Sequence, residues 1–276
     1  KNNIIIFDNL DTGHKKLINK KAIFIKGDIK NKKNLSLILN KYKIKTIFHL
    51  AACLNVSEAE KYKLKYKKNN IQGTKNLVLA CKNSQVKNFI FSSSCSVYGN
   101  VKGSVSESKK LNPQGYYAYT KYKGEKIIQE YSKKFNYNFG LLRYFNVAGA
   151  SNTGNIGEIE KSYGHLIKNL AIQSLKKNPV ISIYGKDYQT KDGTCVRDYI
   201  HVADLANIHI LGMNYLNKVK KSFIVNCGYG KGYSVKEIVN IFKKNKKNLS
   251  IRYEKRRPGD IAQVYSNTKK FKNLFK

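Results

Sequence analysis

A tyrosine and a lysine four residues apart, Tyr117 and Lys121, could together perform acid–base chemistry. They open a segment with helical periodicity, and residues four apart lie on the same face of a helix, so both side chains can reach one cleft. A phenol has a pKa of about 10, and a nearby ammonium lowers it, so that the tyrosinate can accept a proton from a hydroxyl near neutral pH. Tyr119 and Lys123 form a second such pair, so the spacing alone does not identify a site.

Upstream of this pair, an apolar segment ends in a run of serines. Residues 89–99 read FIFSSSCSVYG, which predicts a strand that ends at the serines. An open α/β sheet binds its ligands at the carboxyl ends of its strands, where Ser94 could hydrogen-bond a reacting hydroxyl. A polar loop that merely caps a strand is the alternative for one serine. The combination favours Ser94, Tyr117 and Lys121 as a catalytic trio.

The elements that must position this trio follow an alternating pattern. Short β-branched runs alternate with helical patterns, which indicates a parallel sheet with crossover helices. We predict strands at residues 4–8, 22–28, 46–51, 89–93 and 139–145, and helices at residues 35–42, 70–83 and 117–135. Strands that are apolar on both faces suit a sheet covered on both sides. The predicted fold class is α/β, with a doubly wound, Rossmann-like parallel sheet.

The regular alternation breaks after residue 145, and glycines become frequent. We predict helices at residues 166–176, 203–216 and 235–243, and strands at residues 180–184 and 223–226. The chain is therefore divided into a Rossmann-like domain over residues 1–145 and a smaller α/β domain over residues 146–276, some segments of which return to the sheet.

The composition bears on partners. The formal charge of +36 at pH 7 would suit nucleic acid or an anionic membrane surface. However, only five basic residues are arginines, the side chain that reads bases through its planar fork, and the lysines are scattered along the chain. We therefore predict no nucleic-acid partner, and we expect the positive field to attract a dianionic substrate.

The apolar runs and the cysteines point to a reducing, aqueous compartment. No apolar run approaches the ~18 residues that span a bilayer, so no membrane partner is predicted, and no signal peptide is visible. The five cysteines are an odd number without metal-ligand spacing, so we predict buried thiols, no metal and a cytoplasmic location. They are Cys53, Cys81, Cys95, Cys195 and Cys227.

The order of the motifs resembles the extended short-chain dehydrogenase/reductase superfamily and, more closely, the UDP-galactose (UDP-glucose) 4-epimerase family. The motifs are residues 89–99, Pro113-Gln114, residues 117–121, LLRYFN at 141–146, Tyr184-Gly185, DGTCVRDYIH at 192–201 and RRPGD at 256–260. The resemblance covers essentially the whole chain. It implies an isomerase of carbohydrate metabolism that inverts C4 of UDP-hexoses with NAD, through a 4-keto intermediate, and a homodimer. It also assigns NAD to residues 1–145 and the nucleotide sugar mainly to residues 146–276.

The resemblance implies a set of cofactor-binding residues. They are Asp8, Asn9, Asp28, Ile29, Leu50, Ala51, Ala52, Asn69, Tyr117, Lys121 and Phe145. Asp8 would bind the adenosine ribose, where a carboxylate accepts both hydroxyls and repels a 2′-phosphate, which favours NAD over NADP. Asp28 would meet the adenine, and Phe145 the nicotinamide. Two alternatives stay open: Asp8 could form only an Asx turn, and Asn69 only a helix cap.

A second set is implied for the substrate. It comprises Ser94, Asn146, His165, Leu166, Tyr184, Arg197, Arg257, Asp260 and Val264. Arg197 and Arg257 would pair with the diphosphate, because a guanidinium binds phosphate oxygens bidentately. Asp260 would meet the uridine ribose or, alternatively, only partner Arg257. A small Val264 beside the sugar should leave room for an N-acetyl group, so UDP-N-acetylglucosamine and UDP-N-acetylgalactosamine are expected substrates too.

The sequence departs from the family pattern in two ways. We expect the first strand with its Gly-rich phosphate-binding loop, and the last helices, to be absent from this stretch of chain. Lys168 also stands where related sequences usually carry proline. A dehydratase or decarboxylase on the same scaffold is one alternative, disfavoured because Cys95 and Ser96 follow Ser94 where a dehydratase carries carboxylates. An inactive scaffold fragment is another.

Overall fold

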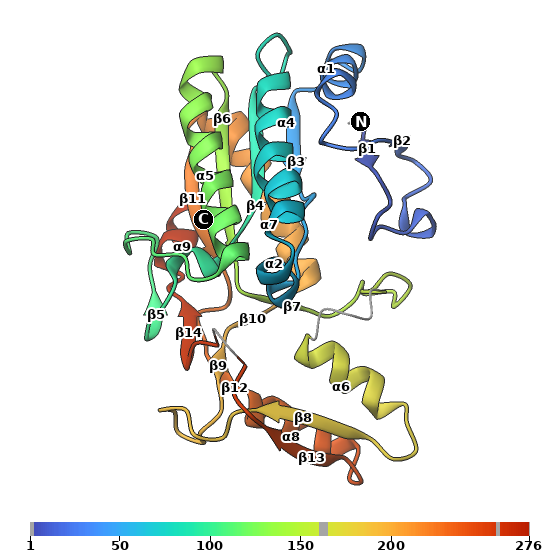
Figure 1. Ribbon diagram of the computed structural model, residues 1–276. Helices are drawn as coiled ribbons and strands as arrows, with labels where there is room; N and C mark the ends of the chain where they lie inside the picture. The colour runs from blue at the N-terminus through green and yellow to red at the C-terminus, as the bar shows by residue number, and fades with distance from the viewer. Residues whose placement is uncertain (1–2, 160–164, 258–259, 276) are drawn as a thin grey trace. The chain divides into compact units, whose positions relative to one another are not determined.

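The computed structural model describes residues 3–159, 165–257 and 260–275 (Figure 1). The chain forms two compact units, each built from segments far apart in the sequence. The first unit comprises residues 1–93, 115–141 and 213–223, and the second comprises residues 94–114, 142–212 and 224–276. All predicted site residues lie within the described ranges.

The main sheet has four strands in the order β11-β6-β4-β3. These strands are β3 (Thr46–His49), β4 (Asn88–Ser94), β6 (Asn138–Tyr144) and β11 (Phe223–Cys227). β3 and β4 run parallel, with Ile47 opposite Phe89. β4 is buried along nearly its whole length, which explains why it is apolar on both faces. The predicted Rossmann-like α/β fold is confirmed.

A separate two-stranded parallel sheet begins the described chain. It joins β1 (Ile5–Asp8) to β2 (Ile23–Lys26), with Asp8 opposite Lys26. Within the described residues β1 pairs only with β2, and β3 is an edge strand of the main sheet. The expected absence of a further strand with its Gly-rich loop stays a prediction.

Helices of the first unit pack against one another beside these strands. α1 (Lys32–Lys41) contacts α4 (Thr74–Ala80), which lies beside α5 (Tyr116–Phe135) (Figure 1). The helix predicted at residues 70–83 instead begins as a π-helix, η2 (Lys67–Gly73), before α4. Such wide turns often mark functional positions, and here the turn carries the buried Asn70. Two further helices, α2 (Val56–Lys61) and α3 (Lys63–Tyr66), are too short to produce a periodic pattern and were not predicted.

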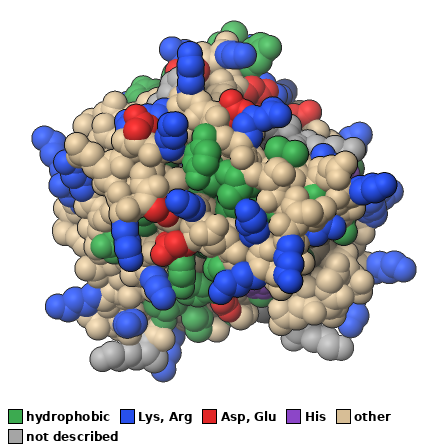
Figure 2. Space-filling model, turned by 90° about the horizontal axis from the view of Figure 1, so that it is seen from below, with side chains coloured by type: hydrophobic (Ala, Val, Ile, Leu, Met, Phe, Trp, Pro, Cys, Tyr) green, Lys and Arg blue, Asp and Glu red, His purple; other side chains and the backbone are tan. Residues whose placement is uncertain are grey.

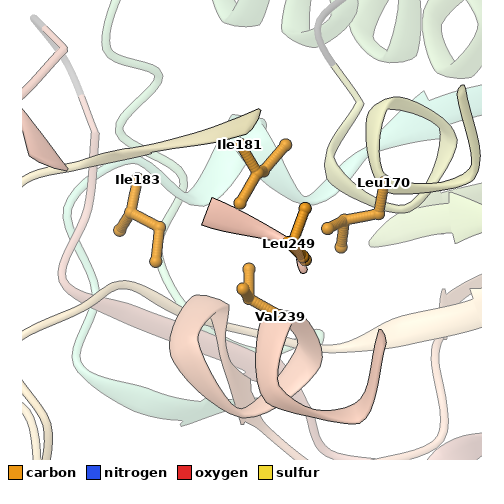
Figure 3. Packing of buried hydrophobic residues seen from close by; sticks show 5 residues of the cluster. All are labelled: Leu170, Ile181, Ile183, Val239 and Leu249. Atoms are coloured by element: carbon orange, nitrogen blue, oxygen red, sulfur yellow. The ribbon is translucent and has the colours of Figure 1, made fainter. Parts of the chain in front are cut away.

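A compact core holds part of the second unit together. α6 (Leu166–Ser174), β8 (Val180–Tyr184), α8 (Val235–Asn245) and β13 (Ser250–Glu254) surround it. Figure 3 shows its buried side chains, Leu170, Ile181, Ile183, Val239 and Leu249. β8 and β13 run parallel, and a capping box between Ser234 and Glu237 begins α8. β13 was not predicted because its partly buried positions, Ile251 and Glu254, do not alternate with exposed ones as in a typical half-buried strand.

Short strands and helices complete the second unit. One sheet has the order β12-β9-β14-β5, and β7 pairs in parallel with β10. Their bounds are β5 (Gly103–Val105), β7 (Asn146–Ala148), β9 (Val196–Arg197), β10 (Tyr199–His201), β12 (Tyr233–Ser234) and β14 (Gln263–Ser266). The helices η3 (Cys95–Tyr98) and α9 (Lys269–Leu274) also belong to this unit, α7 (Val202–Val219) contributes residues to both units, and η1 (Lys15–Leu17) belongs to the first unit. Strands of two to four residues carry no sequence period, so these were not predicted.

The distribution of surface charge, the apolar helices and the burial of the cysteines can each be compared with the predictions. On the face drawn in Figure 2, Lys and Arg side chains stand apart from one another, with other side chains between them. Among the described residues, no helix is both long and apolar enough to span a bilayer. All five cysteines are free thiols; Cys81, Cys195 and Cys227 are buried, whereas Cys53 and Cys95 are partly exposed.

Candidate active site

Helix α5 presents Lys121 to the end of β4. Tyr117 lies in the first turn, and Lys121 follows four residues later on the same face. The Lys121 side chain is only 3% exposed, and its Nζ donates to the carbonyl oxygen of Ser92 at 2.7 Å. Nζ also lies 6.0 Å from the centroid of the Tyr117 ring. The structure therefore brings together the predicted tyrosine and lysine.

Burial changes the acidity of Lys121. Loss of solvent lowers the pKa of its ammonium to about 8, and the nearby Cys53 acts in the opposite direction. The group is therefore still largely charged at neutral pH. A desolvated cation interacts strongly with any negative charge that forms close to it, because the local dielectric is low.

A second buried contact fixes the end of β4. The Ser93 hydroxyl donates to Glu125 Oε1 at 2.6 Å, and Glu125 is fully buried one turn after Lys121 on α5. Lys121 and Glu125 thus hold two successive residues, Ser92 and Ser93, against the helix. Glu125 was not among the predicted site residues, although its spacing from Lys121 placed it on the same helix face.

Ser94 directly follows Ser93 and belongs to the second unit. Its Oγ accepts hydrogen bonds from the backbone N–H of Ser96 at 3.2 Å and from the Ser96 hydroxyl at 3.0 Å. It therefore caps the short helix η3. A serine oxygen that accepts two bonds keeps its own hydrogen for another acceptor. Capping and a catalytic role are thus compatible.

The predicted adenosine-binding residues lie at the carboxyl ends of β1 and β2. Asp8 Oδ1 accepts from Leu10 N at 2.7 Å, so the Asx turn is present. In the described part of the chain, Asp8 Oδ2 makes no hydrogen bond. Asn9 Nδ2 donates to Asp28 Oδ2 at 3.1 Å, which links the two strand ends. One carboxylate oxygen is therefore available for a ribose hydroxyl, so the residues present fit a dinucleotide.

The segment of residues 50–54 is held by Asn70. Asn70 Oδ1 accepts from Cys53 N at 2.8 Å, and its Nδ2 donates to Cys53 O at 3.0 Å and to Thr120 Oγ1 at 3.1 Å. Asn69, which the resemblance assigns to cofactor binding, instead donates to Asn70 Oδ1. Leu50 and Leu54 are 58% and 43% exposed, so the held segment presents apolar side chains outward. Only the fold distinguishes the two adjacent asparagines.

His49 does not add a second positive charge beside Lys121. Burial, with a smaller contribution from Lys121, lowers the pKa of His49 to about 3. Thr74 Oγ1 donates its hydrogen to Asn70 O at 2.6 Å, so it must accept from His49 Nε2, 2.8 Å away. His49 is therefore neutral, with its hydrogen on Nε2. The buried ammonium of Lys121 has no cationic imidazole to repel it.

The predicted nucleotide-binding residues gather around one carboxylate in the second unit. Arg257 Nε donates to Asp260 Oδ2 at 2.9 Å, and Arg197 NH2 lies 3.8 Å from Asp260 Oδ1. The Arg257 guanidinium lies 5.0 Å from the centroid of the Tyr184 ring. Both interpretations of Asp260 stay open, because a partner of Arg257 can also meet a ligand. Two guanidinium groups beside one carboxylate, one of them over an aromatic ring, suit an aromatic base that carries phosphates.

The register of β14 places Val264 beside this cluster. Val264 lies opposite Arg197 of β9 and opposite Gly103 of β5, and it is 5% exposed. Asn146 N donates to Asp198 O, the residue after Arg197, while its own side chain is exposed. The predicted substrate residues Val264 and Asn146 thus flank the arginine from two strands.

His165 and Leu166 lie at the start of α6. His165 Nδ1 lies 3.0 Å from Glu158 Oε1. Lys168 Nζ lies 3.6 Å from the same carboxylate oxygen. An ion pair with Glu158 thus accounts physically for Lys168. Phe145 is buried, and its backbone N–H donates to Cys227 O.

Asp198 is an important residue that sequence analysis left without a role. It is fully buried, and its carboxylate accepts from the N–H groups of Tyr229, Gly230 and Ser266 and from the Ser266 hydroxyl. These bonds join the segment after β11 to β14, two residues beyond Val264. Its place inside the DGTCVRDYIH motif was the sequence signal that could have found it.

Arg256 and Arg257 are adjacent but have different partners. Arg256 Nε donates to Asp187 Oδ1 at 2.8 Å, and its guanidinium lies 4.2 Å from the centroid of the Tyr188 ring. Arg256 is thereby engaged with the loop after β8, whereas Arg257 faces Asp260 and Tyr184. Sequence analysis assigned the nucleotide to Arg257 but did not find the Arg256 contacts.

The parallel α/β fold with a tyrosine–lysine pair beside a strand end defines a class of nucleotide-cofactor enzymes. The chain belongs to the NAD dependent epimerase/dehydratase family, whose model matches residues 1–228. The predicted superfamily is thus confirmed.

Within that family, several similar proteins are UDP-glucose 4-epimerases. The chain is 41% identical over 244 residues to the UDP-glucose 4-epimerase of Lactobacillus helveticus, covering 88% of this chain and 74% of that protein. A solved UDP-glucose 4-epimerase from Bifidobacterium longum, in complex with NAD+ and UDP, is 30% identical with a TM-score of 0.91 and covers 99% of this chain and 85% of its own. The UDP-Glc/GlcNAc 4-epimerase from Campylobacter jejuni is 34% identical with a TM-score of 0.82, covering 98% and 84%.

Replacing Lys121 should change how stability depends on pH. The folded chain holds the Lys121 pKa at about 8, below the 10.5 of an unfolded lysine. Above pH 8 the folded state therefore binds fewer protons than the unfolded state, so the free energy of unfolding rises with pH up to about 10.5. Between pH 7 and 9.5 the wild type should gain about 2 kcal/mol relative to Lys121→Met.

Urea denaturation of both proteins at the two pH values measures this difference. Lys123→Met, at a partly exposed position two residues further along α5, is the control and should leave the pH dependence of the wild type unchanged. An identical pH dependence for the wild type and Lys121→Met would contradict the buried-ammonium assignment.

Proposed function

We propose that this chain interconverts UDP-glucose and UDP-galactose by NAD-dependent inversion at C4, with Tyr117 as the acid–base group. The observation that carries the proposal is the buried Lys121 ammonium beside Tyr117 on one face of α5. Membership of the family and the likeness to UDP-glucose 4-epimerases support the same reaction.

Tyr117 transfers the proton at O4, and Ser94 orients O4 for that transfer. Tyr117 accepts the O4 proton as the C4 alcohol becomes a ketone, and it returns the proton when the alcohol forms again with the opposite configuration. The Lys121 ammonium favours the tyrosinate because opposite charges attract strongly in a water-poor site. Ser94 orients O4 through a hydrogen bond. NAD, when bound, supplies the oxidising and reducing power for the change at C4 and is not consumed.

The first unit provides the residues that would hold NAD. Asp8 and Asp28 would bind the adenosine end, and the Asn70-held residues 50–54 would line the cofactor. Asn9, Ile29 and Asn69 complete that set, and the family resemblance adds Phe145 for the nicotinamide. The assignment of residues 1–145 to NAD and residues 146–276 mainly to the nucleotide sugar is part of this proposal.

Residues of the second unit would bind the nucleotide. Arg197 and Arg257 would bind the diphosphate, while Asp260 would bind the uridine ribose. Tyr184, with His165 and Leu166, would border the uridine, and Asn146 would bind near the diphosphate. A nucleotide held in this way leaves the 4-keto sugar free to rotate about its diphosphate linkage, so that both faces of C4 can react in turn.

We propose that the enzyme acts as a homodimer in the cytoplasm, as the family resemblance implies. The five free thiols are in keeping with a reducing compartment. Light scattering at micromolar concentration tests the dimer, because a mass of one chain would contradict it.

Tyr117→Phe should abolish epimerisation of UDP-galactose, with kcat lowered by at least about a hundredfold, because general acid–base groups contribute on that scale. Turnover is measured in a coupled assay on protein supplied with NAD. Tyr119→Phe is the matched control, since Tyr119 and Lys123 repeat the spacing on the same helix and Tyr119 is 38% exposed. Equal activity of the two variants would contradict the assignment.

The small side chain at residue 264 should admit N-acetyl sugars. The wild type is expected to epimerise UDP-N-acetylglucosamine as well as UDP-glucose, and the likeness to the Campylobacter jejuni enzyme is in keeping with this. Val264→Tyr should lose at least about tenfold in kcat/KM for the N-acetyl sugar, the usual scale of steric discrimination, and keep activity on UDP-glucose. Val264→Leu should have a kcat/KM for the N-acetyl sugar between those of the wild type and Val264→Tyr. A wild type that turns over UDP-galactose but not the N-acetyl sugar contradicts the assignment.

A further inference from the structure

The catalytic helix α5 begins without a cap of its own. Its N-cap residue is Gly115, which has a φ of 80° and no side chain to accept a hydrogen bond. The first N–H groups of any α-helix lack partners within the helix. The helix end frays unless another group accepts hydrogen bonds from them. Tyr117 lies in this first turn, so its position depends on an acceptor from another element.

Glu60 of α2 supplies that acceptor. Its Oε1 accepts a hydrogen bond from the backbone N–H of Tyr116, the first residue of α5, at 2.5 Å. A Cβ at position 115 would lie only 3.0 Å from this oxygen, so glycine there allows the carboxylate to approach. A negative charge at a helix N-terminus is favourable in addition, because it interacts with the helix dipole.

The element that carries Glu60 is itself fixed. Asn55 caps α2 by accepting from Glu58 N at 2.9 Å. The fully buried Tyr66 donates its hydroxyl to Asn55 O at 2.7 Å or Glu58 Oε2 at 2.9 Å. Asn55 also directly follows residues 50–54, which would line the cofactor. A short stretch of chain thus connects the cofactor side of the site to the start of α5.

We propose that Glu60 is a positioning residue for the epimerisation. By closing the first turn of α5, it holds Tyr117 where the phenol can exchange a proton with O4. This role rests on the proposed function of Tyr117. The arginines that would hold the nucleotide belong to the second unit, whereas Glu60 and its partner Tyr116 belong to the first, so the loss of Glu60 should affect kcat and not KM.

A plain surface ion pair is the alternative role for Glu60. Its Oε2 lies 3.8 Å from Lys63 Nζ, and the side chain is 48% exposed. Exposed pairs of this kind contribute little to stability. Helix α5 carries a comparable pair near its C-terminal end, where Glu130 Oε1 lies 2.6 Å from Lys134 Nζ and the Glu130 side chain is 56% exposed. Glu130 is therefore the control for every measurement on Glu60.

Amide hydrogen exchange of residues 115–122 tests the cap without depending on activity. In Glu60→Ala the first-turn amides should exchange about three- to tenfold faster, the range expected for the loss of a helix cap. Glu60→Gln keeps an oxygen that can accept the Tyr116 N–H, so it should restore most of the protection. Glu130→Ala should leave exchange in this segment unchanged.

Steady-state kinetics on UDP-galactose, with the full chain supplied with NAD, tests the catalytic consequence. Glu60→Ala should lower kcat about three- to tenfold with KM within twofold of the wild type, and Glu60→Gln should recover most of kcat. The inference is overturned if exchange in Glu60→Ala is unchanged, if exchange rises but kcat does not fall, or if Glu130→Ala reproduces the effect. Full activity of Tyr117→Phe would instead refute the proposed function, whatever the exchange data show.

Discussion

The buried ammonium of Lys121 is the interaction on which the rest of the site depends. Removing this charge from water costs free energy, as its lowered pKa records, and the Ser92 carbonyl offsets only part of that cost. The fold must therefore hold the end of β4 and α5 firmly together, and the Ser93–Glu125 hydrogen bond adds to that hold. A destabilising group kept in place by its surroundings is typical of a functional site.

The same logic explains which charges surround Lys121. His49 is kept neutral, so that no second cation is buried beside it. Asn70, a neutral amide, links Cys53 to Thr120 with hydrogen bonds that add no charge. The electrostatic effect of Lys121 can thus act on the Tyr117 phenol, for which we propose the acid–base role.

The second unit places two arginines beside one carboxylate. Asp260 lies beside both Arg197 and Arg257, so the guanidinium groups do not simply repel one another. Asp198, buried nearby in the sequence motif, ties β14 to the segment after β11 and so fixes the strand that carries Val264. A lysine-rich surface can attract a dianion from solution, but planar arginines are better suited to orient its phosphates.

The sequence by itself determined the elements with clear periods and the residues inside specific motifs. The strand that ends at Ser94, the helix of Tyr117 and Lys121, and the arginines of the two late motifs could all be located because their signals are local. Only the tertiary structure decided that Asn70 and not Asn69 holds residues 50–54, that Arg256 contacts Tyr188, and that Glu60 caps α5. These roles depend on contacts between residues far apart in the chain, 56 positions for Glu60 and Tyr116, and neither periodicity nor spacing records which distant groups the fold brings together.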